Sequence, residues 1–191
     1  MSRSDRDRWD LRHATAAPHP APPSPALRWL PSPSPTAQVA IDLACGTGRH
    51  TRALRDAGYR VIAADVSRVA LAALRESSAE DPSVLLVQID TEEWPFADES
   101  VDMIVQVDFL DRAALTGIRR TVRPGGLLLI DTFAGEPLPD RPGPQRAAYR
   151  LAYGELTERF RDWQILQLEE STAKGRAAIL ARRPPRRQAR R

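Results

Sequence analysis

Apolar residues recur along the chain in two patterns, which predict strands that alternate with helices. Short continuous or alternating aliphatic runs indicate buried strands, and apolar residues three or four positions apart indicate the helices that cover them. Such alternation is typical of a parallel sheet, so we predict an α/β fold with a doubly wound, mostly parallel sheet of seven strands. The expected strands are residues 39–43, 59–64, 84–89, 103–107, 127–130, 163–168 and 177–180. The expected helices are residues 49–57, a helix capped by Ser67, and residues 112–120 and 156–160.

Two parts of this sheet carry more specific expectations. Residues 84–89 are apolar almost throughout, which is typical of a parallel strand that is buried on both faces. Residues 163–168 and 177–180 lie on either side of Lys174-Gly175. We expect these last two strands to form an antiparallel hairpin that completes the sheet.

The first predicted strand runs directly into a glycine pair at the start of a helix. Gly46 and Gly48 have no Cβ and adopt unusual torsion angles easily, so the backbone can approach a ligand closely. The loop opens the helix predicted over residues 49–57, which Gly58 ends. Unpaired amides and the positive end of the helix dipole should therefore face that ligand.

The residues around the glycine pair bear on which ligand it holds. A dinucleotide fingerprint needs a third glycine three positions after the second, and Thr51 stands there instead. In the other frame, Ala44 replaces the first glycine, so the NAD interpretation fails in both frames. An acid beside the loop, Asp42, suits a ligand that carries an ammonium group better than one that carries a pyrophosphate.

A second acid lies at the distance expected for a ribose contact. Asp65 ends the second predicted strand, 19 positions beyond Gly46. In doubly wound folds, an acid about 20 residues past the glycine loop accepts hydrogen bonds from ribose hydroxyls. The alternative is an ordinary acid at the entry to the helix that Ser67 caps.

The run Asp42 to Gly48, DLACGTG, resembles motif I of the class I S-adenosylmethionine-dependent methyltransferases. The resemblance spans residues 38–181 and implies a Rossmann-like fold. Within that superfamily, four segments look like the small, stand-alone tellurite-resistance-type methyltransferases. These are residues 42–50, 109–112, 131–133, and 154–156 with Phe160.

The resemblance implies S-adenosylmethionine as the cofactor. The glycine loop would wrap its methionine end, Asp65 would bind the ribose, and Asp90-Thr91 matches the place of the acid that bonds the adenine amino group. The residues that we assign to the cofactor are Asp42, Ala44, Cys45, Gly46, Gly48, Asp65, Val66, Asp90, Thr91 and Val107.

In the same family, residues 108–110 would face the methyl group. They lack the Asn/Asp-Pro-Pro-aromatic turn of amine and amide methylation and the Pro-Cys nucleophile of cytosine methylation, so a nucleic-acid base is disfavoured as acceptor. The candidate general bases are Asp108 and His50, although we expect His50 at the surface of the first helical turn. The loop of residues 134–148, with Tyr149 and Tyr153 beside it, is expected to shape the substrate pocket.

The expected activity is methyl transfer to a small molecule, with a thiol or chalcogen nucleophile implied by the resemblance. A hydroxyl acceptor competes closely, because a thiolate needs little help whereas a hydroxyl needs a base. A catalytically silent S-adenosylmethionine-binding domain that acts through a partner is the second alternative, and an NAD-dependent enzyme is the third.

Composition divides the 191 residues into an arm, one domain and a tail. Eight of the 17 prolines lie in residues 1–37, so we expect a poorly ordered arm or lid without regular helix. Its apolar segments, residues 9–12 and 26–30, could cover the cofactor or pack on the sheet. Residues 38–181 form the domain. Six arginines give residues 182–191 the character of a basic, disordered tail, and the rest of the chain is mildly acidic.

The remaining features narrow the class of protein. The net charge of +3 comes from the tail, so apart from weak, nonspecific attraction we expect no nucleic-acid partner. A single cysteine, Cys45, permits neither a disulfide within the chain nor a Cys-rich metal cluster, and we assign no metal ligands. No apolar run is long enough for a membrane span and no leader is expected, so we predict a cytoplasmic monomer or homodimer.

Overall fold

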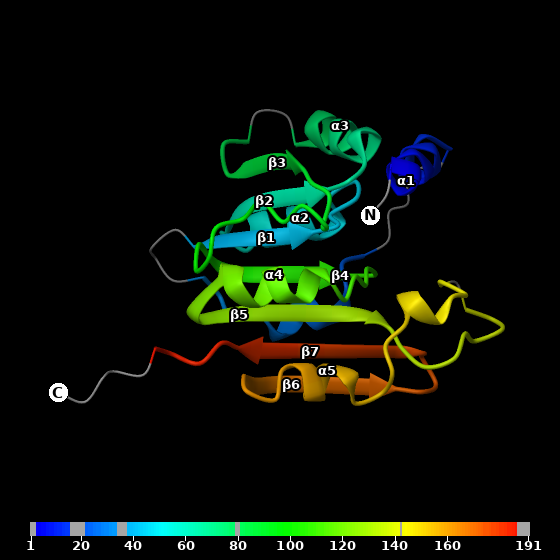
Figure 1. Cartoon of the computed structure of the whole chain (residues 1–191). Coiled ribbons are helices and arrows are strands. Elements are labelled where there is room, and N and C mark those ends of the chain that lie inside the picture. The colour runs from blue at the N-terminus through cyan, green and yellow to red at the C-terminus, as the bar shows by residue number, and fades with distance from the viewer. Residues whose placement is uncertain (1–2, 16–21, 34–37, 79–80, 142, 187–191) are drawn as a thin grey trace.

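The computed structural model describes residues 3–15, 22–33, 38–78, 81–141 and 143–186. Its strands are β1 (Val39–Leu43), β2 (Arg60–Asp65), β3 (Val84–Gln88), β4 (Val101–Val107), β5 (Val122–Phe133), β6 (Gln164–Ser171) and β7 (Arg176–Arg182). They form one seven-stranded sheet in the order β3-β2-β1-β4-β5-β7-β6 (Figure 1). The first five are parallel, and β7 runs antiparallel to both β5 and β6. The predicted doubly wound fold with its antiparallel hairpin is confirmed.

Helices cover both faces of this sheet. They are α1 (Arg3–Thr15), the 3-10 helix η1 (Pro25–Trp29), α2 (Arg49–Asp56), α3 (Arg68–Ser77), α4 (Ala114–Thr121), the 3-10 helix η2 (Ala147–Tyr149) and α5 (Glu155–Arg159). On one face, Leu54 of α2 and Ala26 of η1 are buried in one cluster with Val61 of β2. On the other face, Ile118 of α4 and Leu156 of α5 are buried in a second cluster. The central strands of the sheet are thus covered on both faces, and their ends remain for a site.

The prediction of an arm without regular helix was wrong for the described residues. Residues 3–15 form α1, because the first proline of the chain is Pro18 and nothing before it removes a helical hydrogen bond. The two apolar segments of the arm have different places. Residues 9–12 lie in α1 beyond the carboxyl ends of β1 and β2, next to α3 (Figure 1). Residues 25–29 form η1, which packs on the sheet face. Residues 16–21 and 34–37 lie outside the described part.

The expectation that residues 84–89 are buried on both faces was also wrong. β3 is the edge strand of the sheet and pairs only with β2 in the described structure. Leu85 is 59% exposed as a result. An apolar run indicates that a strand forms, whereas the position of that strand in the sheet depends on the rest of the fold.

The basic tail begins later than predicted. β7 includes Arg182, and Arg183 exchanges backbone hydrogen bonds with Gly125 and Gly126 of β5, at N···O distances of 2.9 Å. The side chains of Arg183 and Arg186 both pair with Glu99. Residues up to 186 are therefore fastened to the domain, and residues 187–191 lie outside the described structure.

An arginine–carboxylate pair fastens α5 to the start of α4. Arg112 donates from Nε and Nη2 to the two oxygens of Glu155, at 2.7 and 2.8 Å, and also to the carbonyls of Ala148 and Arg150. The hydrogen bond from Arg112 lowers the pKa of Glu155 to about 2, from an ordinary value of 4.5. This pair joins the segment after β5, which lies between β5 and α5, to the start of α4.

We expect Glu155→Gln to lower the free energy of unfolding by about 1–3 kcal/mol at pH 7. The folded state keeps Glu155 ionised below the pKa of the unfolded chain, so the stabilisation is present above pH 4.5 and is lost as the pH falls towards 2. Urea unfolding at pH 7 and at pH 3 measures this. Glu158→Gln is the matched control, because Glu158 pairs with Arg161 at the exposed surface. Equal losses in the two variants, or a difference that does not shrink at pH 3, would contradict the assignment.

Candidate active site

Three acids gather at the carboxyl ends of neighbouring strands. Asp42 lies near the end of β1, Asp65 ends β2, and Asp90 follows β3. These strands are parallel and adjacent, so their tips lie along one edge of the sheet, where ligands bind in doubly wound folds. Asp42 and Asp65 are 1% and 7% exposed. Burial of two carboxyl groups this close together is costly unless a ligand or proton balances them.

The glycine loop is held by the acid of the next strand. Asp65 accepts hydrogen bonds from the amides of Gly46 and Ser67, both at 2.8 Å. Gly48 has φ = +84°, and a Cβ there would clash with the side chain of Leu74. Ala44 also has a positive φ of 58°, which is costly for a residue other than glycine. The loop is therefore fixed in one conformation. The amides of Cys45 and Gly48 donate to the carbonyls of Ala64 and Cys45, so the expectation that the loop amides are unpaired was wrong for Cys45, Gly46 and Gly48.

Asp42 holds a proton more tightly than an ordinary carboxyl group. Its Oδ2 accepts a hydrogen bond from Thr51 Oγ1 of α2, at 2.6 Å. Burial raises the pKa of Asp42 to about 7, and the charge of Asp65 adds to this rise while the Thr51 bond opposes it. The charge state of Asp42 consequently responds to any cation that binds beside it.

One face of α1 lies against the same strand tips. Asp10 accepts from Ser67 Oγ and the Val69 amide, at 2.6 and 3.2 Å. The His13 ring lies 3.5 Å from where a Cβ of Gly46 would stand. Arg6 interacts electrostatically with Asp90. Residues 6, 10 and 13 share a helix face, so this spacing could have indicated that α1 faces the acids, although this contact was not predicted.

The other residues assigned to the cofactor also lie at this edge of the sheet, but they differ in burial and in their contacts. The thiol of Cys45 is buried in one cluster with Leu71 and Leu74 and lies 3.5 Å from the Gly46 carbonyl oxygen, and burial raises its pKa well above the ordinary value. Val66 and Val107 are buried at the ends of β2 and β4. The hydroxyl of Thr91 donates to Asp111.

Beside the glycine loop, Asp108 is held between two arginines. It follows β4, which pairs with β1, and its φ is +56°. Its Oδ2 lies 2.8 Å from Arg49 Nη2, and its Oδ1 lies 2.7 Å from Arg176 Nη1. Partial burial raises the pKa of Asp108, but the charge and hydrogen bonds of the two arginines outweigh burial and the net pKa is lowered. Asp108 is therefore ionised and fully engaged.

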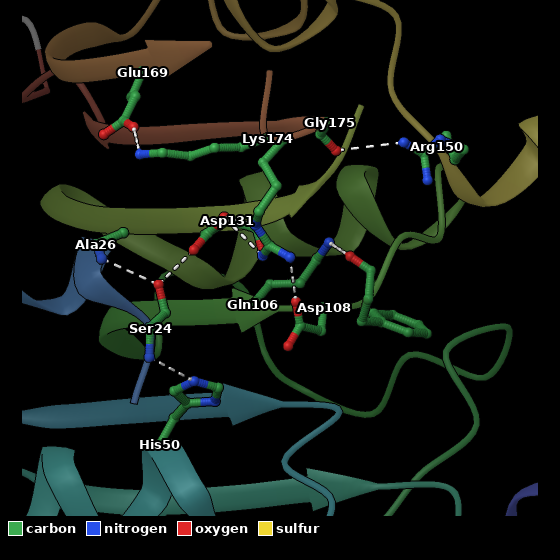
Figure 2. Close-up of polar contacts among 12 residues, drawn as sticks. Ser24, Ala26, His50, Gln106, Asp108, Asp131, Arg150, Glu169, Lys174 and Gly175 are labelled. Carbon is green, nitrogen blue, oxygen red and sulfur yellow. Dashed lines mark hydrogen bonds and ion pairs between the residues drawn. The ribbon is translucent and has the colours of Figure 1, made fainter. Parts of the chain in front are cut away.

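His50 is buried, which contradicts the expectation of a surface position. It is 5% exposed, and its Nε2 accepts the amide hydrogen of Ser24 at 3.2 Å. Burial lowers the pKa of His50 to about 4, so the ring is neutral at physiological pH. Ser24 also donates its hydroxyl to Asp131 at the end of β5, and Figure 2 shows Ser24 between His50 and Asp131.

The partners of Asp108 and His50 were not predicted from the sequence. Asp131 Oδ1 accepts from Arg176 Nε and Nη2, at 2.9 and 2.8 Å. Arg176, which begins β7, thereby bridges Asp108 and Asp131. The position of Asp131 at a strand tip was a usable signal. Ser24 carried no such signal in the sequence, because it lies in the proline-rich arm.

Comparisons with known proteins bear on what this arrangement binds. A sequence profile described as "Methyltransferase domain" matches residues 40–126. A malonyl-[acyl-carrier protein] O-methyltransferase of Pectobacterium atrosepticum is 34% identical over 134 residues, which cover 67% of this chain and 50% of that protein. A demethylmenaquinone methyltransferase of Clavibacter sepedonicus is 36% identical over 104 residues, 52% of this chain and 42% of that one. The chain thus spans about half the length of these curated relatives.

A solved structure shares the fold. TehB from Haemophilus influenzae superimposes with a TM-score of 0.68 at 23% identity, covering 93% of this chain and 66% of that one. The matched profile contains the glycine loop, Asp65 and Asp90. The chain belongs to the class I S-adenosylmethionine-dependent methyltransferases.

The strand tips of this methyltransferase fit the cofactor of its family. S-adenosylmethionine offers hydrogen-bond donors on its ammonium group, its ribose hydroxyls and its adenine amine. The protein offers acceptors, the carboxylates of Asp42, Asp65 and Asp90, at three successive tips. Arg6 Nε is buried and has no hydrogen-bond partner within the described structure, so a polar atom beside Asp90 remains for a ligand. The residues present therefore suit the group.

None of the helices within residues 3–15, 22–33, 38–78, 81–141 and 143–186 is long and apolar enough to cross a bilayer.

Proposed function

We propose that this protein transfers the methyl group of S-adenosylmethionine to a small-molecule acceptor. One observation carries the proposal: three carboxylates at adjacent strand tips surround a glycine loop with positive φ angles. A nucleotide phosphate would be repelled by these acids, whereas the ammonium, hydroxyls and amine of the cofactor are attracted to them. When bound, the cofactor supplies an activated methyl group on a sulfonium.

The roles of the residues follow from their positions. Asp42 would bind the ammonium group, the glycine loop would wrap the methionine end, Asp65 would bind the ribose and Asp90 the adenine amine. Each oxygen of Asp65 accepts one backbone amide and keeps a second lone pair for a hydroxyl. Catalysis would then depend mainly on alignment of the acceptor and exclusion of water.

The acceptor belongs to the region beside Asp108 and the segment after β5. That segment folds back on the sheet through the bridge between Ala134 and Leu151. A thiol or chalcogen nucleophile is our first choice, and a hydroxyl group of a metabolite is the alternative. A domain that binds S-adenosylmethionine without catalysis is the further alternative, and labelled methyl transfer to a panel of thiols, phenols and carboxylates decides between them.

We expect Asp65→Ala to weaken the binding of S-adenosylmethionine about 100-fold, which corresponds to roughly 2.7 kcal/mol. The variant loses the ribose acceptor, and it also frees the amides of Gly46 and Ser67 that fix the loop. Isothermal titration with S-adenosylmethionine measures the affinity, and circular dichroism checks that the variant is folded.

Asp98→Asn is the control, because that carboxylate is 65% exposed and pairs with Arg120. Wild-type affinity in folded Asp65→Ala would remove the ribose assignment. Binding of NADH in place of S-adenosylmethionine to the wild-type protein would refute the proposed function.

A further inference from the structure

The groups that could take a proton from an acceptor are all engaged beside the glycine loop. Both oxygens of Asp108 are bound by guanidinium groups. Asp131 uses one oxygen for Arg176 and the other for the Ser24 hydroxyl. His50 uses Nε2 for the Ser24 amide. Figure 2 shows His50, Ser24, Asp131 and Asp108 in this arrangement. The two guanidinium groups stabilise the ionised form of Asp108, and the lone pair of His50 Nε2 is used by the Ser24 amide, so neither candidate base is poised to take a proton.

The two arginines are available to an incoming anion. The side chains of Arg49 and Arg176 are 31% and 27% exposed, and that of Asp108 is 39% exposed. Arg176 is already neutralised by Asp131, whose side chain is only 9% exposed. Asp108 is therefore the more accessible carboxylate of the group, and it occupies the guanidinium donors in the way that a ligand anion would.

The place of this group fits the acceptor rather than the ribose or adenine. Arg49 follows Gly48 at the start of α2, and Asp108 follows β4, the neighbour of β1 on the side away from β2. The three acids that suit the ribose, adenine and ammonium groups lie on β1, β2 and after β3. The arginines thus lie on the β4 side of the glycine loop, away from β2 and β3.

We propose that the acceptor binds as an anion whose nucleophilic atom is already ionised, a thiolate or a carboxylate. Arg49 and Arg176 hold its charge, and Asp108 is a resident counter-ion that the acceptor partly displaces, not a general base. The lone pair of the acceptor forms the new bond to the methyl carbon as the carbon–sulfur bond breaks with its electron pair going to sulfur. No proton is released. This inference rests on the proposed function and names its substrate class.

The variant Asp108→Asn separates a counter-ion from a base. Asparagine tolerates positive φ at least as well as aspartate, so the backbone at φ = +56° is preserved. A counter-ion that becomes neutral leaves Arg49 without its partner and Arg176 with Asp131 alone, and anions bind more tightly. A base that becomes neutral cannot act, and the rate falls by a factor of about 10²–10⁴.

The first measurement needs no cofactor. Isothermal titration of the free protein with para-nitrobenzoate is expected to show about tenfold tighter binding to Asp108→Asn and about tenfold weaker binding to Arg49→Gln, each a change of roughly 1.4 kcal/mol. The neutral analogue para-nitrobenzyl alcohol should bind the three proteins alike. Arg161→Gln is the control for loss of an exposed arginine. Equal binding of para-nitrobenzoate to wild type, Asp108→Asn and Arg49→Gln would overturn the proposal.

The second measurement follows methyl transfer to para-nitrothiophenolate, whose yellow absorbance is lost on methylation. We expect Asp108→Asn to keep kcat within a factor of about three and to lower KM, because no proton has to be removed. An unchanged or raised KM would overturn the proposal.

A last arm distinguishes the acceptor from the carboxylate of the cofactor as the anion. Titration of Arg49→Gln with S-adenosylmethionine should give wild-type affinity. An equal loss for S-adenosylmethionine and para-nitrobenzoate would assign Arg49 to the cofactor and overturn the proposal. Failure of wild-type protein to bind S-adenosylmethionine would instead refute the proposed function, whatever the anion titrations show.

Discussion

Replacement of Asp42 by asparagine is expected to make the protein more stable at pH 8 and to weaken its binding of S-adenosylmethionine at least tenfold. In the folded protein, burial raises the pKa of Asp42 to about 7, from an ordinary value of 3.8. The difference is roughly three pKa units, and one unit corresponds to about 1.4 kcal/mol. Ionised Asp42 therefore costs the folded state roughly 4 kcal/mol above pH 7, and asparagine removes that cost.

The sign of the pH dependence follows from proton binding. Between pH 3.8 and 7 the folded protein holds a proton on Asp42 that the unfolded chain has lost, so stability falls as the pH rises through this window. Asparagine can still accept the Thr51 hydrogen bond, but its buried NH₂ group needs a partner. This cost is the same at every pH. It offsets part of the gain in stability but does not change how the difference between variant and wild type varies with pH.

Urea unfolding of wild type and Asp42→Asn at pH 5 and pH 8 measures the effect, with Asp98→Asn as the exposed control. The gain of the Asp42 variant over wild type should be larger at pH 8 by about 3 kcal/mol. Parallel behaviour at the two pH values would show that Asp42 is not strained by its charge. Titration with S-adenosylmethionine at pH 8 then tests the functional side, because only a carboxylate can attract the ammonium group.

These expectations describe a site that is stabilised by its ligand. Asp42 raises the free energy of the empty strand tips because burial, and to a lesser degree the charge of Asp65, disfavours its ionised form. A bound ammonium group lowers the pKa of Asp42 again, so cofactor binding should release a proton near pH 7. The cost of the acids in the free protein is recovered as binding energy.

The alternation of strands and helices was predictable from the sequence because each segment carries its own periodicity. The acids at the strand tips were predictable for the same reason, since a strand end fixes where the next polar residue lies. α1 was not, because its 13 residues are mostly charged and its best anchor, the bond from Ser67 to Asp10, joins positions 57 apart. The edge position of β3 was missed because pairing partners are set by the whole sheet.

The polar groups beside the glycine loop show more clearly which contacts were not predictable from the sequence. Arg49 meets Asp108 across 59 positions, and Arg176 meets Asp131 across 45. The chain contains 28 lysine and arginine residues. Long, flexible guanidinium side chains give no local signal of which carboxylate they reach, so the sequence offered Asp108 as a free base. Only the fold reveals that both of its oxygens are taken.

Arg150 is the buried arginine on which the segment after β5 depends. It is 6% exposed, and it donates to five backbone carbonyls, with the shortest distance, 2.6 Å, to Gly135. Figure 2 shows one of these bonds, to Gly175 of the hairpin between β6 and β7. The other acceptors are the carbonyls of Ala134, Glu136 and Pro144. One guanidinium group thus joins both ends of the segment to the sheet.

We expect Arg150→Met to lower the free energy of unfolding by about 3–5 kcal/mol, because a buried carbonyl without a partner costs about 1–3 kcal/mol and several are left at once. Arg150→Lys should recover only part of this loss, since one ammonium cannot reach carbonyls spread around a planar fork. Arg146→Met, at an exposed position four residues earlier, is the control.

Urea unfolding measures stability. The Michaelis constant for the thiophenolate acceptor, compared with the affinity for S-adenosylmethionine, separates the two halves of the site. The Michaelis constant should rise while the cofactor affinity stays near wild type, because Arg150 touches the segment after β5 and not the acids of β1 and β2. A stable Arg150→Met variant with a wild-type Michaelis constant would show that the segment is held by other contacts and does not shape the acceptor site.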